Sequence, residues 1–256
     1  MFGVIIHNLI KMKKILLIVT LIIYTTGSAQ DEFFVGLHYF TIKKQFVKEF
    51  IEQEKSYFSK MHKASIDSGD KIGWDLWSVG DPFSGNEKYQ TFCFAHLQPI
   101  DKPMGSMNSN LFSESEMKMV RKLRKKMVVK SKFIMTVFKG GFVPAAGKKP
   151  PKYLVLNFID VDWKNYYEYE KLALSNIEDR KKSKYLKSWG LHKVVSRTNE
   201  KADYLAANFY DSPVEVYKRF TPTNPMNATQ KKRRDAMGKM TKLIKRENMQ
   251  LILFER

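Results

Sequence analysis

The chain has 256 residues, a net charge of +19 and a single cysteine, Cys93. Its length suffices for one large or two small hydrophobic cores, and the lone cysteine excludes an internal disulfide. The positive charge would attract polyanions such as nucleic acid, acidic glycans or an anionic membrane surface. A solvated, lysine-rich surface would explain the charge equally well.

A signal peptide is predicted at residues 1–29. Met12-Lys13-Lys14 supplies a positive start, the apolar run 15–24 is short for a membrane span, and Gly27-Ser28-Ala29 offers small residues for cleavage. We therefore expect export to the periplasm or beyond the cell, with a retained anchor as the alternative. No second long apolar run follows, so no membrane span is expected after cleavage.

Residues 30–139 predict the order strand, helix, strand, strand, helix, strand. Alternating apolar residues indicate the strands, and three- and four-residue apolar steps indicate the first helix. Ser113 followed by acidic residues marks the start of the second helix. The expected elements are strands at 34–42, 72–79, 89–97 and 133–138, and helices at 44–65 and 113–129.

Residues 140–152 are rich in Gly and Pro and read as a linker. The second half, 153–256, then repeats the order of the first. Its expected elements are strands at 153–159, 189–195, 204–210 and 249–254, and helices at 162–184 and 229–247.

Residues of the two halves match at a nearly constant offset, which is typical of an internal duplication. A βαββαβ unit forms a ferredoxin-like sheet with both helices on one face, and its bare face needs a partner. The second copy can supply that partner. At an offset of 115 residues, Trp74, Leu76, Tyr89 and Phe94 match Trp189, Leu191, Tyr204 and Phe209. At an offset of 116 residues, Glu54 and Lys55 match Glu170 and Lys171.

Through these residues, the sequence resembles the dimeric α+β barrel superfamily, in which two ferredoxin-like sheets pack into a barrel, sometimes within one chain. The sequence is also similar to uncharacterised exported proteins of Bacteroidetes-type bacteria. The resemblance implies an α+β fold of two tandem βαββαβ repeats packed sheet to sheet. It fixes the architecture far better than the activity.

Two glutamates are the candidate acid–base residues. Glu54 lies on the apolar stripe of its helix, between Phe50 and Phe58, and Glu170 lies on the corresponding stripe of the second half. A carboxylate among apolar neighbours loses hydration, so its pKa rises into a range that suits a general acid or base. The alternative is a structural carboxylate held by a tryptophan, tyrosine or lysine side chain.

Strand positions provide a second set of candidates. Aligning the halves pairs His38 with Asn157, Trp77 with His192, and Cys93 with Asn208. If these side chains point between the sheets, they line a small-molecule pocket, and His192 becomes a third catalytic candidate beside Glu54 or Glu170. The alternative is that His38 and His192 are hydrogen-bonded core histidines. The predicted ligand-binding residues are His38, Trp77, Cys93, Asn157, Trp189 and Asn208.

The sequence has no metal-binding spacing of Cys and His, and its five histidines are scattered. The resemblance would allow a haem ligated by His192 or His38, but no motif supports that assignment, and the cofactor stays unknown. No phosphate-binding glycine loop or nucleophile motif is present.

Basic residues crowd the second predicted helix of each half, where they could bind an anionic polymer. Aromatic residues do not interleave them, so stacking on nucleic-acid bases is not expected. The cations are Lys118, Arg121, Lys122, Arg124, Lys125 and Lys126, and Lys231, Lys232, Arg233, Arg234, Lys239, Lys242, Lys245 and Arg246.

Three functions remain open. The favoured one is an exported binding or scaffold protein whose inter-sheet pocket holds a small apolar or aromatic ligand. The second, implied by the resemblance, is a cofactor-poor monooxygenase, a haem-degrading enzyme or an isomerase. It requires Glu54 or Glu170 within hydrogen-bond reach of His192 or His38. The third is a basic surface that binds anionic polymers or membranes.

Overall fold

The computed structural model describes residues 33–80, 88–103, 107, 110–142, 148–197, 201–221 and 225–256. The predicted signal peptide lies outside these residues, and so does part of the predicted linker. Within the described ranges, no helix is long and apolar enough to cross a membrane.

The first half has the expected βαββαβ order. A π-helical turn, Glu54–Phe58, joins α2 to α3 and adds one residue to the helical turn at that point. The elements are β1 (Phe33–Lys43), α2 (Val47–Gln53), α3 (Ser59–Asp67), β2 (Gly73–Val79), β3 (Tyr89–Pro99), α4 (Glu114–Met127) and β4 (Val128–Phe142).

The second half repeats this order with one additional helix, α7. Ser212 caps α7 by accepting a hydrogen bond from the Glu215 amide, and Pro213 occupies its first turn. The elements are β5 (Tyr153–Val161), α5 (Tyr166–Leu174), α6 (Ile177–Lys181), β6 (Ser188–Arg197), β7 (Tyr204–Tyr210), α7 (Pro213–Phe220), α8 (Ala228–Met240) and β8 (Thr241–Glu255).

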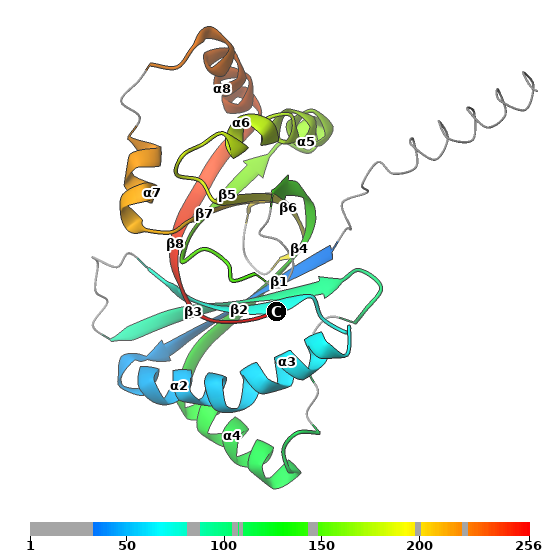
Figure 1. The fold of residues 1–256 in the computed structure, drawn as a ribbon, viewed down its shortest axis with the longest axis vertical. Coiled ribbons are helices and arrows are strands. Elements are labelled where there is room, and N and C mark those ends of the chain that lie inside the picture. The colour runs from blue at the N-terminus through cyan, green and yellow to red at the C-terminus, as the bar shows by residue number, and fades with distance from the viewer. Residues whose placement is uncertain are drawn as a thin grey trace, which may run out of the picture. The chain divides into compact units, whose positions relative to one another are not determined.

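The eight strands form one closed antiparallel barrel in the order β1-β3-β2-β8-β5-β7-β6-β4. Each half contributes a four-stranded ferredoxin-like sheet, and the two sheets join where β2 pairs with β8 and β4 pairs with β6. This confirms the predicted fold class. Helices α2, α3 and α4 cover one side of the barrel, and α5 to α8 cover the other (Figure 1).

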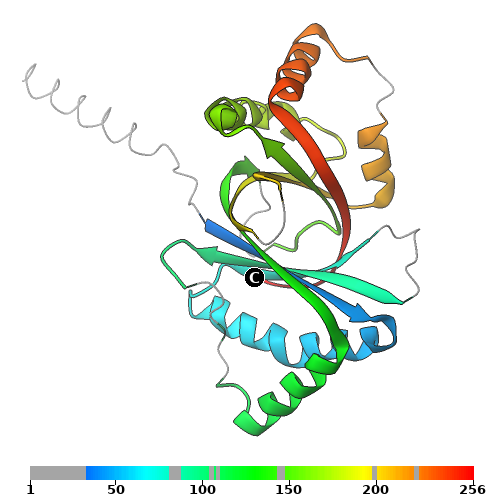
Figure 2. The same cartoon turned by 180° about the vertical axis from the view of Figure 1, so that it is seen from behind.

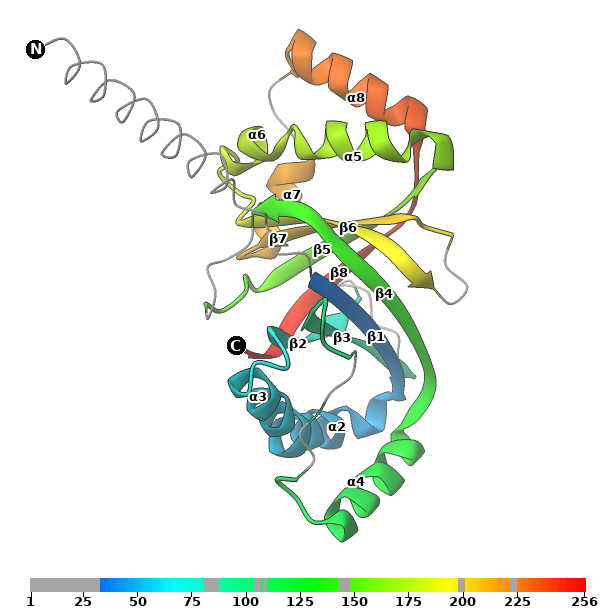
Figure 3. The same ribbon diagram turned by 90° about the vertical axis from the view of Figure 1, so that its right-hand side faces the viewer.

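The last strand of each half is much longer than the sequence predicted. β4 begins at Val128 and β8 at Thr241, where helix was expected. Each strand pairs first within its own half and then across the junction with the other, and this pairing overrides local helix preference. Figures 2 and 3 show β4 running from α4 to the second half.

The longer β8 corrects the prediction for the second basic helix, because three of its cations lie on a strand instead. Lys242, Lys245 and Arg246 belong to β8. Arg124 also departs from the predicted solvated face, since its side chain is only 16% exposed and is paired with Glu54. The cations that remain exposed on α4 are Lys118, Arg121, Lys122, Lys125 and Lys126.

The apolar side chains divide into layers, because alternate residues of a strand face opposite sides of the sheet. An inner cluster between the sheets includes Leu37, Trp77 and Leu205. An outer cluster beneath α2 and α4 includes Phe50. Its counterpart in the second half includes Tyr169.

Candidate functional site

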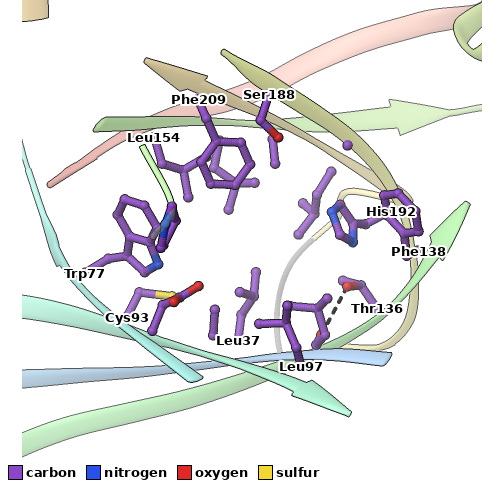
Figure 4. A pocket seen from close by; sticks show the side chains of 18 of the residues that line it. Leu37, Trp77, Cys93, Leu97, Thr136, Phe138, Leu154, Ser188, His192 and Phe209 are labelled. Atoms are coloured by element: carbon purple, nitrogen blue, oxygen red, sulfur yellow. Dashed lines mark hydrogen bonds between the residues drawn. The ribbon is translucent and has the colours of Figure 1, made fainter. Parts of the chain in front are cut away.

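A cavity of about 260 Å³ lies inside the barrel, between the two sheets. Its walls are mainly apolar and come from strands of both halves (Figure 4). The inward-facing positions of the strands supply them, among others Val35 and Leu37 of β1, Cys93, Ala95 and Leu97 of β3, Leu154 and Leu156 of β5, and Leu205, Ala207 and Phe209 of β7.

Trp77 and His192 lie on opposite walls of this cavity (Figure 4). Among the described residues, neither the Trp77 Nε1 nor the His192 Nδ1 has a hydrogen-bond partner, although both atoms are buried. Burial lowers the pKa of His192 to about 4, so the imidazole is neutral at neutral pH. A neutral imidazole offers one donor and one acceptor nitrogen.

The position of His192 depends on Phe138 and Gly190. The rings of Phe138 and His192 pack with their centroids 5.3 Å apart. A Cβ atom at Gly190 would lie 3.0 Å from His192 Nε2 and 3.1 Å from Phe138 Cε2. Any larger residue at position 190 would therefore displace one of the two rings.

The cavity also contains an ion pair that sequence reasoning missed. Arg256 Nη2 donates to Asp75 Oδ2 at 3.0 Å, and Arg256 Nη1 lies 2.7 Å from Asp75 Oδ1. Burial raises the pKa of Asp75, and the Arg256 charge opposes that rise. The available signal was an aspartate between Trp74 and Leu76 in the mainly apolar strand β2.

Lys148 also lines the cavity, and two hydroxyl groups of the wall bond to backbone. Thr136 Oγ1 donates to the Val35 carbonyl at 3.0 Å, and Ser188 Oγ donates to the Phe142 carbonyl at 2.7 Å. Both hydroxyl hydrogens are therefore used in hydrogen bonds. The ring nitrogens of Trp77 and His192 remain available to a ligand.

Three of the predicted site residues line the barrel cavity, namely Trp77, Cys93 and His192. Cys93 is fully buried, and burial raises the pKa of its thiol well above the ordinary value. The thiol is therefore protonated and chemically inert at neutral pH.

Two predicted ligand residues of the second half face its helices instead. Trp189 packs against the Arg180 guanidinium, which lies 4.3 Å from its ring centroid. Asn208 donates from Nδ2 to the carbonyls of Val155 and Ala206, at 3.1 and 3.0 Å. These contacts are structural, and neither residue lines the barrel cavity.

The predicted correspondence of Cys93 with Asn208 was wrong, because the third strands of the two halves pair in a different register from the one assumed. Trp74 pairs with His96 across the first sheet, whereas Trp189 pairs with Asn208 across the second. Asn208 therefore corresponds to His96, and both side chains point to the helices. The alignment is thus off by three residues (96 − 93), and a shift by an odd number of residues reverses the face of a strand, which is why Cys93 points inward and Asn208 does not.

Asn157 and Glu170 are also placed away from the cavity. The Asn157 Oδ1 accepts a hydrogen bond from Arg246 Nε at 2.9 Å. Glu170 accepts one from the Tyr204 hydroxyl at 2.8 Å, and Lys193 lies 3.9 Å away. The Glu170 carboxylate is thus bound by a tyrosine outside the cavity that His192 lines. This placement corrects the hypothesis that Glu170 acts together with His192.

Glu54 and His38 line a separate pocket of about 270 Å³, between the first sheet and its helices. Glu54 is fully buried, and its carboxylate accepts a hydrogen bond from Arg124. Burial raises the pKa of Glu54 to about 7 against the opposing charge of Arg124. Glu54 is thus also separated from His192, although it shares a pocket with His38.

No group of three or more His, Cys, Asp or Glu side chains is arranged to hold a metal ion within the part of the chain that the structure describes.

No family model and no curated protein matches the sequence. Solved structures match the fold. A protein provisionally described as a monooxygenase from Fusobacterium nucleatum is 13% identical with a TM-score of 0.54, over 88% of this chain and 94% of that one. A similarly described protein from Lactobacillus acidophilus is 11% identical with a TM-score of 0.55, over 88% and 96%.

An anthrone oxidase-like protein is 14% identical with a TM-score of 0.52, over 89% of this chain and 94% of that one. Identities this low establish a shared fold and leave the activity open. The fold is that of the dimeric α+β barrel proteins, with both sheets in one chain.

Proposed function

We propose that the barrel cavity binds a small aromatic molecule that carries one or two polar groups. The observation that carries this proposal is an apolar, inter-sheet cavity with unpartnered ring nitrogens of Trp77 and His192 on opposite walls. A cavity of about 150 Å³ accommodates benzene, so 260 Å³ suits a ligand of about two fused rings. Buried polar atoms without partners favour a ligand that satisfies them.

The test compares 1-naphthol with naphthalene by calorimetric titration of the whole chain. Trp77→Phe removes the indole nitrogen and His192→Phe removes both imidazole nitrogens, and each leaves an aromatic ring in place. Because 1-naphthol has one hydroxyl and the two ring nitrogens lie on opposite walls, at least one of the variants should weaken 1-naphthol binding about fivefold to tenfold, equivalent to one hydrogen bond, with little effect on naphthalene.

Trp189→Phe is the matched control, because it makes the same replacement on the helix-facing side of the barrel. It should leave both affinities unchanged. Equal losses in all three variants, or no binding of either probe to the wild-type chain, would overturn the proposal.

Oxidation of the bound molecule by O₂ is the second candidate function. It is supported by the neutral imidazole of His192, which can remove a proton from an acidic C–H or O–H group in the cavity. It is also in keeping with the structural similarity to two proteins described as monooxygenases and to an anthrone oxidase-like protein. An activated methylene would become a carbonyl, with one oxygen atom of O₂ retained and the other released as water.

Oxygen uptake with anthrone as the probe tests this candidate. Uptake by the wild-type chain that is lost in His192→Phe and kept in Trp189→Phe would support it. Uptake that does not depend on His192 would exclude the role of His192 as the base.

A further inference from the structure

The outer pocket of the first half, between α2, α3, α4 and the sheet, has the features of a second binding site. Its volume is about 270 Å³. The sheet contributes His38 and His96, and the helices contribute Glu54, His62 and Arg124. It lies on the opposite side of the β1–β3 sheet from the barrel cavity, so the two sites are separate.

Arg124 is the main charged group of this pocket. Its guanidinium carbon lies 4.4 Å from the ring centroid of Phe58, 4.8 Å from that of Phe40 and 5.0 Å from that of Phe50. Its Nη1 donates to Glu54, and its remaining N–H groups have no partner among the described residues. A guanidinium has five N–H donors, so several of them are available to an oxyanion.

Among the described residues, Glu54 is the only carboxylate that lines the pocket, and the π-helical turn that begins at this residue presents it there. The other titratable groups facing it are neutral or cationic. His38, His62 and His96 have pKa values lowered by burial, and Lys71 contacts His62 Nδ1 at 2.9 Å. A bound anion would therefore interact unfavourably with Glu54 alone.

The corresponding carboxylate of the second half has different partners, because its nearby cation is Lys193, at 3.9 Å, and not an arginine. The position of Glu54 is taken there by Glu170, which is bound by the hydroxyl of Tyr204. An arginine paired with a carboxylate among phenylalanines is thus specific to the first half within the described ranges.

We propose that the outer pocket binds a small aromatic carboxylate, which takes the free N–H groups of Arg124 while Glu54 takes up a proton. The phenyl rings of Phe40, Phe58 and Phe94 suit an aromatic body, and the buried, unpartnered Nδ1 of His96 offers a further polar contact. Protonation of Glu54 removes the repulsion between the two carboxylates. Its pKa of about 7 makes this protonation inexpensive near neutral pH.

Calorimetric titration of the whole chain with benzoate tests the proposal. At about pH 7.5, comparison of triethanolamine and Tris buffers, whose buffering ions are cationic and do not compete for Arg124, should reveal uptake of about half to one proton per benzoate bound. The affinity should fall by up to about tenfold per pH unit above neutrality. Benzamide, which has the same shape without the charge, should bind at least about tenfold more weakly.

Two variants assign the effect to residues. Glu54→Gln should bind benzoate without proton uptake and without the pH dependence. Arg124→Met should lose at least about tenfold in affinity, whereas Arg121→Met, an exposed position on the same helix, should lose none.

The proposal is overturned if benzoate fails to bind or binds no better than benzamide. It is also overturned if wild-type binding takes up no proton. These wild-type measurements decide the matter even if Arg124→Met does not fold.

Discussion

Glu54 and Glu170 occupy corresponding positions in the two halves but are held by different partners. Arg124 binds the carboxylate of Glu54, and the Tyr204 hydroxyl donates to that of Glu170 at 2.8 Å. The side chain of Glu54 is 1% exposed and that of Glu170 is 22% exposed. The same residue type is therefore half of a buried ion pair in one half and a hydrogen-bonded, partly solvated acceptor in the other.

This difference predicts unequal effects of the same substitution. Glu54→Gln resembles the neutral carboxyl that burial favours, so at neutral pH it should leave the free energy of unfolding unchanged or raise it. Arg124→Met leaves the buried Glu54 carboxylate without its counter-charge and should lower the free energy of unfolding by about 3 kcal/mol. Glu170→Gln keeps an acceptor for Tyr204 and should cost about 1 kcal/mol or less. Urea unfolding at neutral pH measures these changes. In the double variant Glu54→Leu with Arg124→Met, the loss should be smaller than for Arg124→Met alone, and a larger loss would contradict the ion-pair account.

Buried His192 predicts a loss of stability in mild acid. Its pKa is about 4 in the folded state and about 6.5 when unfolded, so the unfolded state binds more protons between these values. Stability should fall by up to about 3 kcal/mol as the pH drops from about 6.5 to 4. His192→Gln should remove that part of the slope. Glu54 acts in the opposite sense, because its raised pKa favours the folded state as the pH falls below about 7. The informative quantity is therefore the difference in the free energy of unfolding between His192→Gln and the wild-type chain.

Alanine substitutions at three glycines are expected to change the free energy of unfolding by different amounts. At Gly141 a Cβ atom would lie 2.1 Å from the Trp189 carbonyl oxygen, so Gly141→Ala must separate β4 from β6 and should cost about 3 kcal/mol or more. Gly190→Ala contacts only side chains and should cost about 1 to 2 kcal/mol, with weaker 1-naphthol binding.

Gly238 is the control for these two positions. It lies in α8, where an added Cβ atom meets nothing within 4 Å. Gly238→Ala should therefore raise the free energy of unfolding by about 0.5 to 1 kcal/mol. A loss of stability in this variant would show that the space around α8 is not as described.

The buried thiol of Cys93 predicts slow modification. Because burial raises its pKa, iodoacetamide should label the folded chain at about pH 8 many times more slowly than the urea-unfolded chain. Since Cys93 lines the barrel cavity, a saturating cavity ligand should slow labelling further. Rapid labelling of the folded chain, followed by mass spectrometry, would contradict this placement.

The sequence was sufficient to predict the architecture because the duplicated pattern of apolar steps is strong in both halves. The prediction from sequence was wrong at the starts of the long strands β4 and β8. Residues 242–247 are mostly charged and helix-favouring, yet they pair with β5 as part of β8. Such pairing depends on contacts between distant residues, which local preference does not encode.

Prediction of the candidate site depended on strand register. Trp77 and His192 occupy corresponding positions of the second strands, and both line the cavity. The third strands were aligned on Tyr89 with Tyr204 and Phe94 with Phe209, which does not follow the backbone pairing. The buried Arg124 was also missed. Its signal was present, since Met117, Val120, Arg124 and Met127 follow helical steps along the buried face of α4.

The two long strands mean that neither half is complete in itself. β4 donates its end to β6 of the second half, and β8 donates its end to β2 of the first. A chain cut between β4 and β5 should therefore remain assembled through both junctions. Separately produced halves should find each other by fragment complementation, because each presents the unpaired strand edges that the other needs.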